Sequence, residues 1–286
     1  MKGRARIRLV IIYIAAAVVL AGTVGPFLWL VSSSFQYERQ LLNRPPQWLP
    51  NPIVLDSYRE IFEGAVMGED SGVPYQSRIF LRSFANSFFV AVIAVMAGAY
   101  AAYPLARLRF RGRQVLLFAI LASRLIPALS LAIPIVLVAK RIGMSDKIIS
   151  LVFINLSFIL PYVIWLLQSY FKTIPMELED AGRIDGCSRL QVVHKIILPL
   201  SLPGLTSAAI LAFLLTWGEF LFALLLSESP SSYTSTVVVS LFATDVDVSF
   251  VSIITAGVLS VIPPICFALI FQRYIISGLL SGSLKG

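Results

Sequence analysis

The sequence predicts an all-α integral membrane protein with six transmembrane helices. Hydrophobic residues make up 58% of the 286 positions and charged residues only 13%, and the mean hydropathy is +0.86. Soluble domains carry about 25% charged residues, so the composition excludes an ordinary soluble protein. Backbone groups in lipid must pair internally, so each apolar run long enough to span is expected to be helical. These runs are Leu9 to Val31, Ser87 to Leu105, Val115 to Val138, Ile148 to Phe171, Gly204 to Leu226 and Phe250 to Phe271.

The first run follows a basic N-terminus, as a signal peptide would. It is longer than the apolar core of a signal peptide and lacks a clear Ala-x-Ala site, so we expect it to remain as an anchor. Basic residues orient the chain, because cytoplasmic loops are enriched in them. We therefore expect both termini and the 172–199 loop to be cytoplasmic. The strongest indication is a loop of four arginines free of acids, namely Arg107, Arg109, Arg111 and Arg113. The net charge of +8 is more simply explained by this topology than by binding to nucleic acid.

The segment of about 32–84 is the only sizeable part expected outside. Residues 44–52 are too rich in proline for regular structure, whereas Asp56 to Phe62 is typical of a short N-capped helix. Such a segment could cover the helix mouths by plain packing or help to dock an external protein.

Polar residues inside the predicted spans are candidates for a substrate pathway. Arg124 lies in the third run and Glu219 in the fifth, where a charge is costly unless it faces a partner or a polar cavity. Asn155 adds a hydrogen-bonding group and Trp217 an aromatic face. The alternative is that Arg124 and Glu219 form a structural pair. Kinks, which often accompany substrate sites in transporters, are expected at Pro127, Pro134, Pro263 and Pro264.

The polar loop between the fourth and fifth runs predicts two short helices. Pro175 and the acids that follow suit a helix N-terminus, and Asp185-Gly186 is a turn dipeptide. Ser188 and Gln191 form a capping-box pattern, so a second helix should run from Arg189 until Pro199 ends it. Such a hairpin could lie in a groove of a soluble partner or merely cover the bilayer surface.

This loop resembles the cytoplasmic loop of permease subunits of bacterial ABC importers, which reads Glu-Ala-Ala, three residues, Gly, nine residues and Ile-x-Leu-Pro. Asp180 to Gly182, Gly186 and Ile196 to Pro199 match the spacing. Asp180 replaces Glu, and Gly182 replaces the second Ala, which weakens a helix by about 1 kcal/mol. The run Trp217 to Ala223 and the C-terminus from Gln272 are similar to the maltose-type sugar permeases.

The resemblance implies a single permease domain, 1–286, with a core of about 80–276 and six helices of the type I ABC importer kind. It also implies a bacterial inner-membrane assembly with a second related permease, two ATPase subunits and an external substrate-binding protein, importing a sugar. This chain would hold no cofactor, and ATP and Mg²⁺ would belong to the ATPase. The coupling residues are expected to be Glu179, Asp180, Ala181, Gly182, Asp185, Gly186 and Ser188. The substrate-pathway residues are expected to be Arg124, Asn155, Trp217, Glu219 and Phe220.

Enzyme chemistry finds little support in the sequence. His194 is the only histidine, so no His-based triad or histidine metal cluster can form. No Gly-Lys dipeptide occurs, which excludes a Walker A loop, so another chain must hydrolyse ATP. An ion-driven secondary transporter would be expected to carry several acids within its spans, but this sequence offers only Glu219. A membrane-embedded enzyme would need a nucleophile beside a base, and the sequence shows no such pair.

Overall fold

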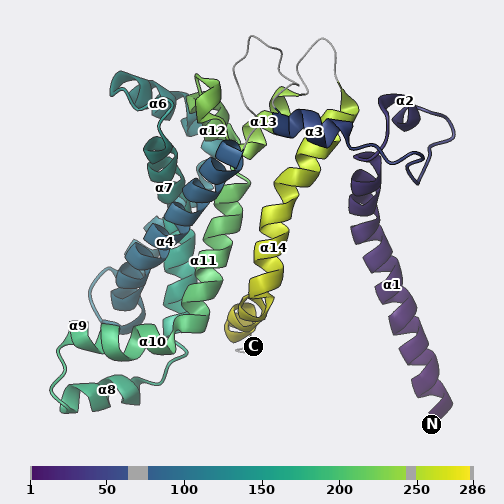
Figure 1. Ribbon diagram of the computed structural model, residues 1–286. Helices are drawn as coiled ribbons and strands as arrows, with labels where there is room; N and C mark the ends of the chain where they lie inside the picture. The colour runs from purple at the N-terminus through teal and green to yellow at the C-terminus, as the bar shows by residue number, and fades with distance from the viewer. Residues whose placement is uncertain (1, 64–76, 243–248, 284–286) are drawn as a thin grey trace. The chain divides into compact units, whose positions relative to one another are not determined.

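The computed structural model describes residues 2–63, 77–242 and 249–283, and every regular element in these ranges is a helix (Figure 1). The predicted all-α class is therefore confirmed. The chain divides into two compact units, residues 1–76 with 238–262 and residues 77–237 with 263–286. Residues 64–76, which are part of the predicted external segment, and residues 284–286 at the C-terminus lie outside the described residues. That the whole chain is one permease domain stays a prediction.

The first unit begins with α1 (Lys2–Ser33), α2 (Glu38–Leu41) and α3 (Asp56–Glu63). The most apolar window of α1 has none of its residues buried within the chain, as expected of a helix surrounded by lipid or by another subunit. The helix predicted from Asp56 is confirmed as α3, and residues 44–52 form no helix or strand. The Glu38 carboxylate accepts the backbone N–H groups of Phe250 and Val251 at 3.0 and 3.1 Å, so it stabilises the N-terminus of α14 (Phe250–Ser283).

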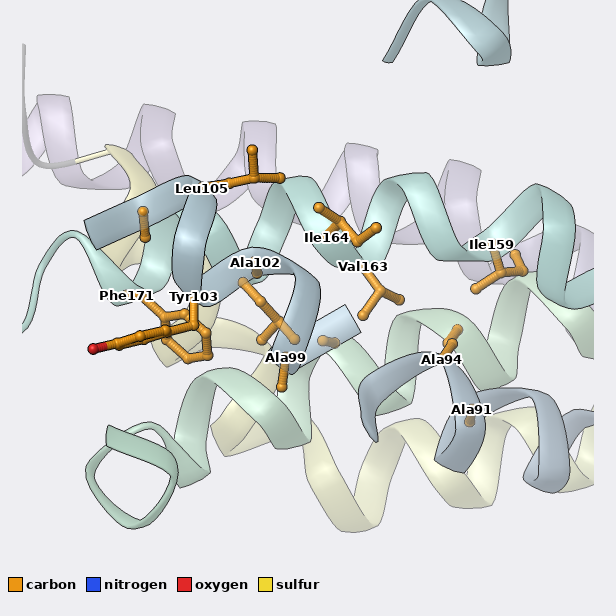
Figure 2. Close-up of a cluster of buried hydrophobic side chains, with 14 of the residues drawn as sticks. Ala91, Ala94, Ala99, Ala102, Tyr103, Leu105, Ile159, Val163, Ile164 and Phe171 are labelled. Atoms are coloured by element: carbon orange, nitrogen blue, oxygen red, sulfur yellow. The ribbon is translucent and has the colours of Figure 1, made fainter. Parts of the chain in front are cut away.

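The second unit is built on three packed helices, α4 (Ser77–Arg107), α7 (Ile148–Phe171) and α11 (Leu202–Trp217). Figure 2 shows small side chains of α4, such as Ala94 and Ala99, among the larger Ile159 and Val163 of α7. A Cβ at Gly98 would lie only 2.6 Å from Cγ1 of Val163. Small residues let helix backbones approach closely in a membrane, where dispersion contacts rather than hydrophobic burial favour association.

The number of spans agrees with six, but two of the six are bent. Four helices are each long and apolar enough to cross a bilayer, and two bent pairs raise the total to as many as six. The single helices are Arg8–Ser33, Ile79–Arg107, Ile148–Phe171 and Phe250–Arg273, and the pairs are Arg113–Leu125 with Ala128–Arg141 and Arg189–Leu200 with Leu202–Trp217.

The third predicted run is not one continuous helix, which corrects the expectation from its composition. Helix α5 (Arg113–Ala122) continues through the short 3₁₀ turn η2 (Ser123–Leu125), and the next helix, α6 (Ala128–Arg141), departs at 87°. Ile126 is extended, with φ −75° and ψ 119°, because a residue before proline disfavours the helical region. By contrast, α6 continues through Pro134 and α14 through Pro263.

The fifth predicted run also differs, since α11 ends at Trp217 instead of continuing to Leu226. A separate helix, α12 (Leu221–Leu226), follows after three residues, and then the 3₁₀ turn η4 (Pro230–Ser232) and α13 (Ser235–Leu241). Glu219 therefore lies in a break between two helices and not within one, and this break creates free backbone N–H groups that need a partner.

Asp146 ties the loop after α6 to the loop after α12. Its Oδ1 accepts the backbone N–H groups of Glu228 at 2.6 Å and Ser229 at 3.0 Å, and its own N–H donates to Leu226 O at 3.0 Å. Burial would raise the pKa of the Asp146 carboxyl, but hydrogen bonds from Ser232 and from the two backbone amides lower it to about 2. The carboxylate therefore stays ionised at physiological pH and holds both loops.

Close packing at Gly98 predicts a defined loss of stability. Gly98→Ala adds a methyl group against the stiff, buried Val163, so we expect the free energy of unfolding to fall by about 1–3 kcal/mol. Gly257→Ala is the matched control, because no described atom outside its own stretch of helix lies within 4 Å of its Cβ position. Unfolding in detergent micelles would measure both variants, and equal stabilities for the two would contradict this account of the helix contact.

Candidate functional site

The polar segment 173–199 folds as a hairpin with two helical arms (Figure 1). The first arm is α8 (Met176–Ile184), and the second comprises α9 (Arg189–Val192), the π turn η3 (Val193–Ile197) and α10 (Leu198–Leu200). Two helices are thus confirmed, but Pro199 does not end the second, since it lies inside α10. The π turn before Pro199 shifts the hydrogen-bond register, so the missing proline N–H does not interrupt the arm.

The turn between the arms has two local signals that the sequence predicted. Gly186 has φ +87°, and Cys187 N–H bonds to Gly182 O at 3.0 Å, as in a Schellman C-cap. Ser188 N–H donates to Gln191 Oε1 at 2.7 Å, and Gln191 N–H donates to Ser188 Oγ at 3.3 Å, which confirms the capping box. No described atom lies within 4 Å of a Cβ at Gly186, so its backbone angle, and not a close contact in this chain, favours glycine.

A buried ion pair fastens the first arm to α4. Arg107 Nε lies 2.6 Å from Glu179 Oε1, and the two side chains are only 5% and 7% exposed. The Tyr103 hydroxyl donates to Glu179 Oε2 at 3.0 Å, and Arg107 Nη2 donates to Ile174 O at 2.6 Å. The carboxylate and the guanidinium are each paired with polar groups, which a buried ion pair needs in order to compensate for its lost hydration.

The second arm reaches the same helix through His194. Its Nδ1 lies 2.9 Å from Leu190 O, and its Nε2 lies 2.6 Å from the hydroxyl of Tyr100. A carbonyl oxygen can only accept, so Nδ1 carries a proton, and in the neutral imidazole Tyr100 donates to Nε2. Together with the ion pair, this contact holds both arms of the hairpin on one helix.

The hairpin presents a different set of residues outward. Ile184 and Leu190 lie on its outer surface and are 86% and 61% exposed. Of the predicted coupling residues, two are buried, namely Glu179 and Gly182. The exposed ones are Asp180, Ala181, Asp185, Gly186 and Ser188.

Gly182 permits the two arms to pack against each other. The side chain of Ile196 occupies the place where a Cβ on residue 182 would sit, and Val192 Cγ2 is 3.7 Å from it. Glycine at position 182 lowers the helix propensity of the first arm, but it allows the two arms to come into closer contact.

Arg124 lies at the break of the third span and stacks on aromatic rings of α7. Its guanidinium carbon is 4.7 Å from the ring centroid of Tyr162 and 5.7 Å from that of Phe158. Cation–π contacts stabilise a charge in surroundings with little water. Its Nε is buried and has no hydrogen-bond partner. Arg124 forms no ion pair with Glu219 in the described residues, so the two are not a structural pair.

Glu219 fills the break between α11 and α12, within the fifth predicted run. Its two carboxylate oxygens accept the N–H groups of Phe222 at 2.7 Å and Ala223 at 3.0 Å, and so they cap α12. The Phe222 ring in turn lies 5.2 Å from that of Phe158, which also faces Arg124. The breaks of the third and fifth spans are thus joined through one aromatic ring of α7.

The remaining pathway candidates differ in their surroundings. Asn155 is 3% exposed, and its Nδ2 has no hydrogen-bond partner. It lies on α7, three residues before Phe158. Trp217 is 6% exposed and belongs to the core, with its ring 5.8 Å from Phe213. Phe220 is 38% exposed. Asn155 and Arg124 therefore hold unpaired polar atoms, whereas Trp217 packs within the bundle.

The anchor of the hairpin was missed by sequence reasoning, although a signal existed. Tyr100, Tyr103 and Arg107 follow the i, i+3, i+7 spacing of one helix face, and all three bond to the hairpin. Arg107 was interpreted only as a topology signal. Phe158 and Tyr162, the rings beneath Arg124, are spaced i, i+4 on one face of α7 and were likewise not singled out.

Comparisons with known proteins identify the family of the chain. Residues 94–280 match the family described as "Binding-protein-dependent transport system inner membrane component". The trehalose transport system permease protein SugB of Mycobacterium tuberculosis is 35% identical over 263 residues, covering 91% of this chain and 92% of that protein. The trehalose/maltose transport system permease protein MalG of Thermococcus litoralis is 31% identical over 278 residues, covering 97% of each.

A solved structure supports the fold. One chain of a bacterial ABC transporter involved in the import of the acidic polysaccharide alginate superposes with a TM-score of 0.70 at 23% identity, covering 94% of this chain and 96% of that one. Members of the matching family are non-catalytic membrane subunits, and the ATPase is a separate subunit. The chain belongs to the family of binding-protein-dependent transport system inner membrane components, the permease subunits of ABC transporters.

Proposed function

We propose that this chain imports a sugar and is coupled through the 173–199 hairpin to a partner ATPase. Relatives across nearly the whole length are named for trehalose, maltose and galactooligosaccharide transport, which supports a sugar as the substrate class. The observation that carries the coupling role is the anchored hairpin, with exposed Ile184 and Leu190 on it and buried Glu179 beneath. A short helix with exposed apolar residues suits a groove on a soluble partner.

Coupling then has a physical route. The ATPase contacts the exposed Asp180, Ala181, Asp185, Gly186 and Ser188, while Glu179 and Gly182 act as positioning residues inside the hairpin. Because the hairpin is bonded to Tyr100, Tyr103 and Arg107 of α4, a displacement of the hairpin moves α4 with it. Helix α4 packs on α7 and α11, so the motion reaches the bundle and drives alternation between outward and inward openings.

The substrate pathway is proposed at the two helix breaks. Arg124 and Asn155 offer buried polar atoms without partners, and such atoms can hydrogen-bond to sugar hydroxyls. Aromatic rings at Phe220 and Tyr162 suit the apolar face of a sugar ring. Glu219 and Trp217 shape the break by capping α12 and by packing in the core.

The complete transporter requires further components. We infer a second related permease, two ATPase subunits that bind ATP and Mg²⁺, and an external substrate-binding protein, in the inner membrane of a bacterium. Both termini of this chain lie on the cytoplasmic side, as the arginines between α4 and α5 favour.

Removing the anchor should uncouple transport. Glu179→Gln leaves Arg107 buried without its counter-charge, which costs about 3 kcal/mol or more, so we expect sugar transport to fall by about tenfold or more while the ATPase still co-purifies. Glu177→Gln, an exposed acid of the same helix, is the matched control. Transport assays in vesicles measure both, and wild-type rates in Glu179→Gln would contradict the proposed route.

Asn155→Ala should weaken the sugar interaction. Loss of one hydrogen bond is worth about 1 kcal/mol, so the sugar concentration for half-maximal transport should rise by about fivefold with assembly unchanged. Ser157→Ala on the exposed side of α7 is the control. Loss of folded protein, with unchanged affinity in what remains, would assign Asn155 to packing instead.

Cysteine labelling tests the orientation. In a chain whose Cys187 and Cys266 are replaced by serine, Phe110→Cys should react only from the cytoplasm and Leu49→Cys only from outside, since both positions are exposed. The reverse pattern would overturn the inferred topology.

A further inference from the structure

A cavity lies beside the proposed cytoplasmic ends of the spans. Every charged side chain among the described residues that line it is basic. Its volume is about 600 Å³, and it lies between the loop after α4, the start of α5 and the end of α7. Arg109, Arg113 and Lys172 line it together with Gln114 and Gln168, and no acidic side chain is among the described residues that line it.

The three cations are not neutralised from elsewhere. None of them forms an ion pair in the part of the chain that the structure describes, unlike Arg107, which is committed to Glu179. Burial and the neighbouring charge of Arg113 both lower the pKa of Lys172. Like charges that converge on one cavity repel each other, and a bound anion would remove this repulsion.

The position of the cavity identifies the kind of anion. The apolar windows of α4 and α7 end at Arg107 and Phe171, and the bent pair begins at Arg113, so the cavity lies at the level of lipid headgroups. Phe110, Val115 and Leu117 add apolar lining on the side of α5, and Val115 is 71% exposed. A ligand with both a phosphate and an acyl chain would satisfy both kinds of lining.

We propose that this cavity binds the headgroup of an anionic phospholipid, with Arg109, Arg113 and Lys172 around the phosphate and the acyl chain along Val115 and Leu117. Basic pockets between transmembrane helices on the cytoplasmic side are suited to such headgroups. The site is independent of the sugar pathway and of the hairpin's outer face, and it rests on the proposed function only for the side of the membrane on which it lies.

Native mass spectrometry of the intact chain in detergent tests this site. Phosphatidylglycerol should bind about tenfold more tightly than phosphatidylcholine with the same acyl chains, because one lipid is anionic and the other has no net charge. In the double variant Arg113→Gln/Lys172→Gln the preference should fall to about twofold. The matched control, Arg141→Gln/Lys147→Gln, removes two exposed cations elsewhere and should retain it.

Three results would overturn the proposal. Equal binding of the two lipids to the unaltered chain would exclude an anionic headgroup site, and this comparison needs no variant to fold. An equal loss of preference in both double variants would indicate general charge attraction. Binding of inorganic phosphate that depends on Arg113 and Lys172, without any lipid preference, would assign the cavity to a free anion.

Discussion

The buried pair of Arg107 and Glu179 is the interaction on which the hairpin end of the second unit depends. Two ionised groups with side chains about 95% covered have lost most of their hydration, and their mutual attraction and the hydrogen bonds to Tyr103, Ile174 and Met176 compensate for it. Removal of either partner would leave an unpaired charge where water cannot reach. The hairpin is therefore held to α4 by a contact that is costly to break. This is why the two are proposed to move as one body.

The rigidity of the contact between the hairpin and α4 matters because α4 in turn packs against α7. Helix α4 meets α7 through small residues around Gly98, and side chains packed at close distance transmit displacement with little loss. The same α7 bears Phe158, which touches the breaks of both the third and the fifth spans through Arg124 and Phe222. Helix α7 thus joins the α4 helix that anchors the hairpin to the breaks where the substrate is proposed to pass.

Sequence reasoning succeeded where the signal is local. The capping box of Ser188 and Gln191 and the left-handed Gly186 depend on neighbours in the chain, so their patterns suffice to predict the turn. Long-range contacts were not predictable in this way: Glu179 lies 76 positions from Tyr103, and only folding shows that it faces inward. Trp217 was assigned to the pathway by its residue type, and only the structure shows that it packs beside Phe213 in the core, so its pathway role stays a prediction. Pro127 was expected to kink a span and instead divides it, because Ile126 before it leaves the helical region of backbone angles.

The central claim is that the hairpin and α4 form one rigid lever during the transport cycle. Spin labels at Asp185, on the exposed turn, and at Met96, on an exposed position of α4, would report their separation in the assembled transporter with and without ATP. A second pair, from Asp185 to the matching turn of the partner permease, would verify that the complex cycles. The account predicts an unchanged distance within the chain while the distance between subunits changes, and a nucleotide-dependent shift between Asp185 and Met96 would contradict it.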